Sequence, residues 1–214
     1  MGQEKKSTEL TPSKVQKLMD WTYEKVLNGL PGTRSIYEIV ADYSTKDKES
    51  AIRSLVNIQT LKTSLAGFVT GLGGLITLPV AVPADIASSL YVNMRMVGAI
   101  ALLRGYDLKN DQVRTMVFAT ITGESIKDAI KAIGVKTGEK CAKEAIEKHL
   151  TRDVIKKINE KICKRFITKN GEKGIINATK AVPIVGGFIS CAFDFAGTRT
   201  IAKLAKVEFK DKSV

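Results

Sequence analysis

The sequence has few cysteines and few aromatic residues. Its 214 residues include three cysteines, Cys141, Cys163 and Cys191, and 6% of them are aromatic. No two cysteines form a C-x-x-C pair, which argues against a disulfide framework or a zinc site and fits a reducing cytosol. Because aromatic residues are scarce, aliphatic side chains must build the core, and the chain is long enough to form one.

The familiar motifs of catalysis and of nucleotide binding are also missing. His149 is the only histidine and no G-x-S-x-G sequence occurs, so nucleophilic catalysis has little support. The glycines from Gly71 to Gly74 lack the preceding strand and the third glycine of a dinucleotide fingerprint. No RNP pattern, zinc finger or interleaving of basic with aromatic residues points to nucleic acid. We therefore predict no cofactor, no metal, no catalytic residue and no nucleic-acid partner.

Strand-like alternation of apolar and polar residues never extends beyond about four residues. Helical spacing instead runs through most of the chain, so we predict an all-α bundle of seven or eight helices. Local signals predict where the helices begin and end. The expected N-caps are Thr11, Thr33, Asn110 and Thr151, a capping box is expected at Ser44–Asp47, and a turn at Asn170-Gly171.

One long segment carries no charge. Residues 63–84 contain no acidic or basic side chain, and Gly67, Gly71 and Gly74 share one helical face there. Such a face allows a second helix to approach closely. A second apolar unit begins at Gly186 and Gly187. The bundle is therefore predicted to be built around two glycine-rich apolar helical units.

The apolar hairpin at 64–104 has three interpretations. Its uncharged part is about as long as a membrane span, which needs ~20 residues. It could span a bilayer permanently, insert reversibly from one side, or form the glycine-packed core of a soluble protein, since an all-round apolar helix is typical of either environment. The sequence leaves these three open, although Pro79 and Pro83 must kink or end a helix.

A few polar residues interrupt the apolar helices. Because a buried charge needs a partner, we predict that some of them form a polar cluster that lines a ligand cavity. For Asp85, which follows Pro83, capping of the next helix is the simpler explanation. The residues of the predicted cluster are Asp85, Asn93, Arg95, Asp194 and Arg199.

The charge is strongly basic and uneven. Lys and Arg number 34 against 22 Asp and Glu, a net charge of +12, and residues 124–173 carry 14 basic and 8 acidic residues. A field of this sign attracts anionic partners, although the same lysines could simply form a solvated face. The predicted docking residues for an anionic membrane are Lys127, Lys131, Lys140, Lys143, Lys156, Lys157, Lys161 and Lys164.

Two stretches resemble the EcsC protein family. The first contains Gly73-Gly74, Pro83-Ala84-Asp85, a long apolar helix and Gly105-Tyr106-Asp107; the second contains Val182-Pro183, Gly186-Gly187, Asp194 and Thr198-Arg199. The resemblance covers about 63–207, and Asp194 stands where Asn is more usual. The family takes its name from a gene beside those of a bacterial ABC transporter. The resemblance thus implies a bacterial, membrane-linked helical protein and supplies no catalytic residues.

From these observations we predict an N-terminal helical arm at 1–43 and an EcsC-like domain at 44–214. The favoured function is a non-enzymatic accessory or interaction protein, cytoplasmic and peripheral at the inner face of the membrane. Its partner would be the anionic membrane or a membrane protein such as an ABC transporter. One alternative is a soluble protein that holds a lipid-like ligand among Met94, Met96, Phe188 and Phe193. Another is a hydrolase that uses Asp85 and Asp194.

Overall fold

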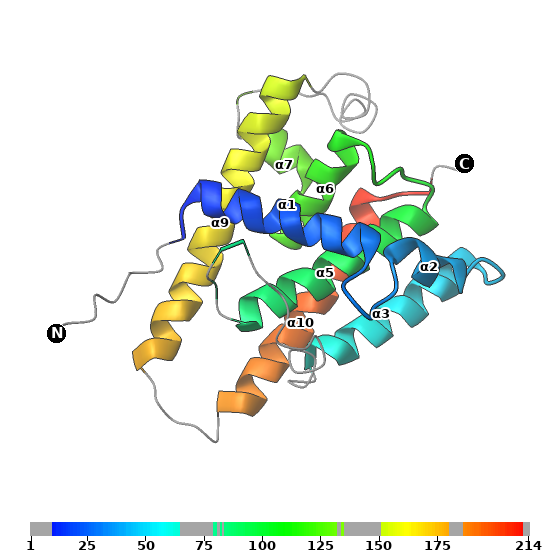
Figure 1. The fold of residues 1–214 in the computed structure, drawn as a ribbon, viewed down its shortest axis with the longest axis horizontal. Helices are drawn as coiled ribbons and strands as arrows, with labels where there is room; N and C mark the ends of the chain where they lie inside the picture. The colour runs from blue at the N-terminus through cyan, green and yellow to red at the C-terminus, as the bar shows by residue number, and fades with distance from the viewer. Residues whose placement is uncertain are drawn as a thin grey trace.

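The computed structural model is helical in the part of the chain that it describes (Figure 1), which confirms the all-α prediction. The backbone is described for residues 10–64, 79, 80, 82, 84–131, 134, 151–179 and 186–211, and the side chains for all of these except 62–64, 84, 85, 169–179 and 186–196. Eight helices lie in these ranges: α1 (Pro12–Asn28), α2 (Ile36–Ala41), α3 (Lys48–Ser64), α5 (Ala84–Leu103), α6 (Asp111–Ile121), α7 (Ile126–Lys131), α9 (Arg152–Thr179) and α10 (Gly186–Glu208).

Helix α5 is the centre of the fold. It contacts α1, α2, α3, α6 and α10, and its residues from Leu90 to Ala101 are all buried. Each large aliphatic side chain removed from water in this way contributes about 1.5–3 kcal/mol. The segment Ile86–Leu103 is long and apolar enough to cross a membrane, but 67% of it is buried inside the protein. The described part of the hairpin thus packs as a core helix.

The other helices pack around α5 in two groups. Helices α3 and α10 contact each other and α5, while α9 contacts both α1 and α6 (Figure 1). Val15, Leu18 and Met19 of α1 are fully buried and belong to the same hydrophobic cluster as Ile100 and Phe118. The predicted boundary at residue 43 therefore does not separate two hydrophobic cores among the described residues.

Most of the helix ends lie where the local signals place them. The side chain of Thr11 accepts a hydrogen bond from the backbone N–H of Lys14, and Asn110 caps α6 in the same way. Thr151 accepts from the backbone N–H of Val154 at 3.4 Å. These caps satisfy backbone donors that the first helical turn leaves free.

Three local predictions were wrong. Ser35, not Thr33, caps α2 through a reciprocal capping box with Glu38, because the Thr33 hydroxyl instead closes the preceding turn by bonding both backbone groups of Leu30. Before α3, Asp47 accepts from the backbone N–H of Ser50, so the expected box at Ser44–Asp47 does not form. Helix α9 continues through Asn170-Gly171, because each glycine within a helix costs only about 1 kcal/mol relative to alanine.

The glycine predictions fall partly outside the described residues. Gly67, Gly71 and Gly74 lie outside the described residues. Gly186 and Gly187 are the first two residues of α10. The close helix approach that the structure describes occurs at Gly98 of α5, where an added Cβ would lie 2.9 Å from Cδ1 of Ile36. This glycine allows α2 to pack directly on the central helix.

Candidate functional site

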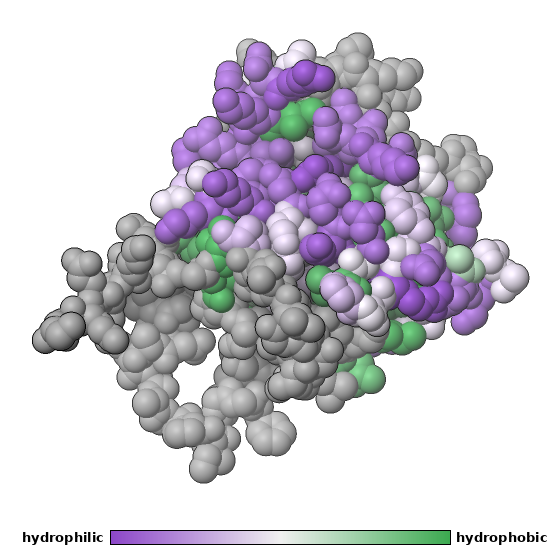
Figure 2. Space-filling model, viewed as in Figure 1, coloured by the Kyte–Doolittle hydropathy of each residue, from purple (hydrophilic) through white to green (hydrophobic). Residues whose placement is uncertain are grey.

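Helix α9 presents a basic outer surface. Its apolar residues Ile158 and Ile162 are fully buried, and the helical repeat places Lys157 and Lys164 together on the opposite face. Figure 2 shows hydrophilic residues across most of the face that includes α1, α7 and the first half of α9. We call the exposed cations of α7 and α9 the basic surface: Lys131, Arg152, Lys156, Lys157, Lys164 and Arg165.

Some cations of this region are held by partners within the protein. Lys161 donates to the carboxylate of Glu124 at 3.0 Å, and Arg165 donates to the backbone carbonyls of Thr122 and Gly123 at 3.4 Å. Lys164 forms an exposed ion pair with Glu160 at 3.3 Å. Exposed ion pairs contribute little to the stability of a protein. Lys161 is thus occupied, while Lys127 is half-buried and Lys140 and Lys143 lie outside the described residues.

The predicted polar cluster is only partly described. Arg95 is 6% exposed, donates to the backbone carbonyl of Arg34 at 3.2 Å and lies over the ring of Tyr91. Burial lowers the pKa of Arg95, and the nearby charge of Arg34 lowers it further, while Tyr91 acts in the opposite direction. Arg95 therefore relies on a backbone carbonyl and an aromatic ring in this part of the structure.

The remaining members of the cluster do not meet Arg95 among the described side chains. Asn93 is buried and donates to the backbone carbonyl and hydroxyl of Ser89, and its Oδ1 has no described partner. Arg199 is exposed. The side chains of Asp85 and Asp194 lie outside the described residues, so the hydrolase hypothesis gains nothing from the described part.

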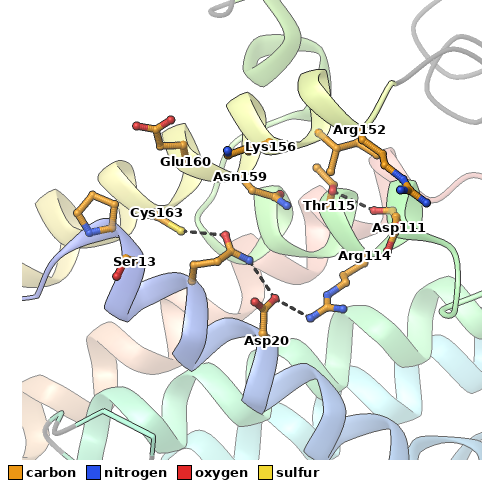
Figure 3. Close-up of a pocket in the computed structure, with 13 residues that line it drawn as sticks. Ser13, Asp20, Asp111, Arg114, Thr115, Arg152, Lys156, Asn159, Glu160 and Cys163 are labelled. Atoms are coloured by element: carbon orange, nitrogen blue, oxygen red, sulfur yellow. Dashed lines mark hydrogen bonds and ion pairs between the residues drawn. The ribbon is translucent and has the colours of Figure 1, made fainter.

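A pocket of about 620 Å³ lies between α1, α6 and α9 (Figure 3), and we call it the polar pocket because most of its lining residues are polar or charged. Three helices from distant parts of the chain form it, and each contributes both charged and uncharged polar groups. Among the described residues, no group of three or more His, Cys, Asp or Glu side chains could hold a metal ion. The pocket is lined by Pro12, Ser13, Gln16, Asp20, Asp111, Arg114, Thr115, Arg152, Ile155, Lys156, Asn159, Glu160 and Cys163.

A chain of hydrogen bonds runs along one wall of this pocket (Figure 3). The Cys163 thiol donates to Gln16 Oε1 at 3.4 Å, and Gln16 Nε2 donates to Asp20 Oδ1 at 2.9 Å. Arg114 donates to the same Asp20 oxygen at 2.6 Å. Its guanidinium also lies over the rings of Tyr23 and Phe118, at 5.1 and 5.6 Å from their centroids. Arg114 is therefore fixed from two sides.

Two further groups of the pocket have unusual surroundings. Burial, reinforced by the nearby carboxylates of Asp20 and Glu160, raises the pKa of the Cys163 thiol to about 12. The thiol thus stays protonated, as its role as a donor requires, and is a poor nucleophile. Asn159 points between the helices (Figure 3), and its buried Oδ1 has no hydrogen-bond partner within the described structure.

The sequence analysis did not identify this pocket. Gln16 and Asp20 on α1, and Asn159 and Cys163 on α9, are pairs four residues apart beside the buried face of their helix. This i, i+4 pattern was the only local signal. It does not reveal which helices face each other, because that depends on tertiary packing.

Comparison with known proteins identifies the family of the chain. The model of the EcsC protein family matches residues 2–211, so the chain belongs to the EcsC family. The match extends beyond the stretch at 63–207 that carries the resemblance and includes α1 and α2. No curated protein and no solved structure matches the chain.

Proposed function

We propose that this protein is a non-enzymatic, membrane-associated accessory protein that docks on anionic lipid through the basic surface of α9 and α7. The observation that carries the proposal is the exposure of Lys156 and Lys157 on α9, neither of which has an ion-pair partner among the described residues. Arg152 and Lys164 are exposed on the same helix, and Asp153 and Glu160 lie among these cations. The whole chain has the same sign of charge, +12.

Simple electrostatics supports binding of this kind. Each Lys or Arg near an anionic bilayer contributes about 1 kcal/mol, and the attraction falls off within a Debye length of about 8 Å at physiological salt. Lysine outnumbers arginine 26 to 8 in the chain. Since lysine offers a hydrated point charge rather than a bidentate fork, it suits a general anionic surface better than one specific phosphate.

The proposed location is the cytoplasmic side of the membrane. Residues 64–83, the uncharged first part of the hairpin, are the proposed element that inserts into the bilayer or packs on a partner helix. A membrane protein, such as an ABC transporter, is the proposed protein partner. In this arrangement the basic surface provides reversible attraction and the uncharged segment provides the apolar contact.

Vesicle sedimentation with charge-reversal variants tests the proposal. We expect the protein to sediment with vesicles that contain phosphatidylglycerol and not with purely phosphatidylcholine vesicles. Lys157→Glu together with Lys164→Glu should weaken this binding at least about tenfold, since it reverses two charges on the outer face of α9. Lys109→Glu with Lys203→Glu makes the same change of net charge at exposed positions outside α7 and α9. Equal effects of the two pairs would contradict a docking role for α9.

One observation favours a second candidate, a protein that holds a lipid-like ligand. The buried Asn93 Oδ1 has no described partner, and its neighbours Met94 and Met96 are fully buried in the core. A ligand with a hydroxyl group could donate to this oxygen while its tail occupies apolar space. Native mass spectrometry of the purified protein would detect such a ligand as an added mass, and the bare mass of the chain would argue against this candidate.

A further inference from the structure

We infer that the polar pocket between α1, α6 and α9 binds a small zwitterionic molecule, namely a short peptide with free amino and carboxyl ends. The pocket shares Arg152 and Lys156 with the basic surface, but its other lining residues lie outside that surface. Its lining combines three cations, Arg114, Arg152 and Lys156, with three carboxylates that Asp20, Asp111 and Glu160 contribute. The inference does not depend on the proposed membrane function.

The charge balance of the lining selects the class of ligand. Arg114 neutralises Asp20, and Lys164 pairs with Glu160 from outside the pocket. This leaves the guanidinium of Arg152 and the ammonium of Lys156 open to an anionic group, and the carboxylate of Asp111 open to a cationic group. The Asp111 carboxylate would repel a simple anion, and the two open cations would repel a simple cation. A zwitterion satisfies both signs, as electrostatic complementarity requires.

The amide of Asn159 supplies a specific contact. Its Oδ1 is buried inside the protein and has no hydrogen-bond partner among the described residues. Since an unpaired buried acceptor destabilises a protein, a ligand that donated to this oxygen would remove that cost. A free amino group or a peptide N–H is such a donor, whereas a carboxylate or a fully ionised phosphate is not.

The length of the pocket favours a peptide over a single amino acid. Its lining on α9 extends from Arg152 to Cys163, which at 1.5 Å per residue corresponds to about 16 Å. An extended chain spans about 3.4 Å per residue, so four or five residues match this length. In Figure 3, Arg152 and Asp111 lie at one end of the pocket and Ser13 and Glu160 at the other. The polar groups thus line a groove rather than a single point.

Calorimetric titration of the wild-type protein with defined probes tests the class of ligand. We expect tetraalanine with free ends to bind, and N-acetyl-tetraalanine amide to bind at least about tenfold more weakly. Equal binding of the free and blocked peptides would overturn the inference, as would no detectable binding of tetraalanine at millimolar concentration. Tighter binding of glycerol phosphate or of glycerophosphoethanolamine than of tetraalanine would also overturn it, because the pocket would then prefer a phosphate or a lipid headgroup.

Two variants locate the binding within the pocket. Asn159→Leu removes the unpaired acceptor and should abolish tetraalanine binding while the melting temperature stays the same or rises. Asp111→Asn keeps the shape of the side chain and should weaken binding at least about fivefold through the lost attraction for the amino group. Asn57→Leu, at an exposed position of α3, is the matched control and should bind as the wild type does. Full binding by both pocket variants would overturn the assignment.

The membrane proposal and the peptide proposal can be tested independently of each other. The pocket variants leave Lys157 and Lys164 unchanged, and neither of these lysines lines the pocket. Vesicle binding should therefore be the same in Asn159→Leu as in the wild type. Peptide binding should likewise persist in the Lys157→Glu, Lys164→Glu variant.

Discussion

Lys161 of α9 and Glu124, which precedes α7, form an ion pair whose carboxylate is almost completely buried. Lys161 Nζ lies 3.0 Å from Glu124 Oε1, and the Glu124 side chain is 4% exposed while that of Lys161 is 33% exposed. The second carboxylate oxygen of Glu124 is buried and has no partner among the described residues. This pair joins α9, which carries most of the basic surface, to the turn between α6 and α7.

Replacing Lys161 by Met should lower the free energy of unfolding by about 2–3 kcal/mol, because it leaves a buried carboxylate without its counter-charge. The loss should be smaller than that for a fully buried pair, since water reaches part of Lys161. Urea unfolding measures the effect. Lys157→Met on the outer face of α9 is the control and should stay within about 0.5 kcal/mol of the wild type. Equal losses in the two variants would contradict the structural role of the pair.

Tyr23 makes the stability of the folded protein decrease at alkaline pH. Its hydroxyl donates to the backbone carbonyl of Leu108 at 2.7 Å, and burial, the largest influence, raises its pKa above the usual value of 10.0. The phenol ionises more easily in the unfolded chain, so its contribution is complete below about pH 10 and is lost as pH rises further. The melting temperature of the wild type should therefore fall between about pH 9 and pH 11 more steeply than that of Tyr23→Phe. At neutral pH the variant should be less stable by about 1 kcal/mol.

If Tyr23 were accessible to water, the two proteins would lose stability in parallel above about pH 10. Tyr43 is half-buried. Tyr43→Phe therefore serves as the control and should retain the wild-type pH dependence.

Cys163 should resist alkylation. Its thiol is buried, donates to Gln16, and has a pKa raised to about 12 by burial. Since the thiolate is the reactive form, iodoacetamide at about pH 8 should leave Cys163 unmodified in the native protein and modify it quickly in urea. Peptide mass spectrometry separates this cysteine from the other two. Equally fast labelling in both states would contradict the described packing of α1 against α9.

Gly98 and Ile36 should be energetically coupled. A Cβ at residue 98 would lie 2.9 Å from Cδ1 of the fully buried Ile36. Gly98→Val should cost about 1–3 kcal/mol by crowding this contact. Shortening the neighbour with Ile36→Val removes the crowded methyl group, so the double variant should be more stable than the sum of the two single changes predicts. Strict additivity in chemical denaturation would show that α2 does not pack on α5 at this point.

The helices were largely predictable because their signals are local. Thr11, Asn110 and Thr151 cap the backbone of their own first turn, so sequence spacing alone identifies them. Thr33 failed as a cap because its hydroxyl has a competing bond within the preceding turn. Asn170-Gly171 failed as a turn because α9 continues through both Gly171 and Gly174. In both cases two local structures compete for the same residues, and the sequence signal for one of them does not show which structure forms.

The candidate site was less predictable because it depends on tertiary contacts. The lysines of α9 could be placed on its outer face from helical periodicity, but periodicity does not show that Glu124 holds Lys161. Likewise, Arg114 stands 94 residues from Asp20 in the sequence and forms an ion pair with it. Neither ion pair has a sequence signature. Predicting them requires knowing which faces of α1, α6, α7 and α9 contact each other.

Fractionation of cells that naturally express the protein tests the proposed membrane docking most directly. Washing the membrane fraction with high salt should release the protein, because screening weakens the attraction of the basic surface for anionic lipid. The Lys157→Glu, Lys164→Glu variant should be found mainly in the soluble fraction before any wash. A wild-type protein found wholly in the soluble fraction at physiological salt, or released from membranes only by detergent, would contradict electrostatic docking.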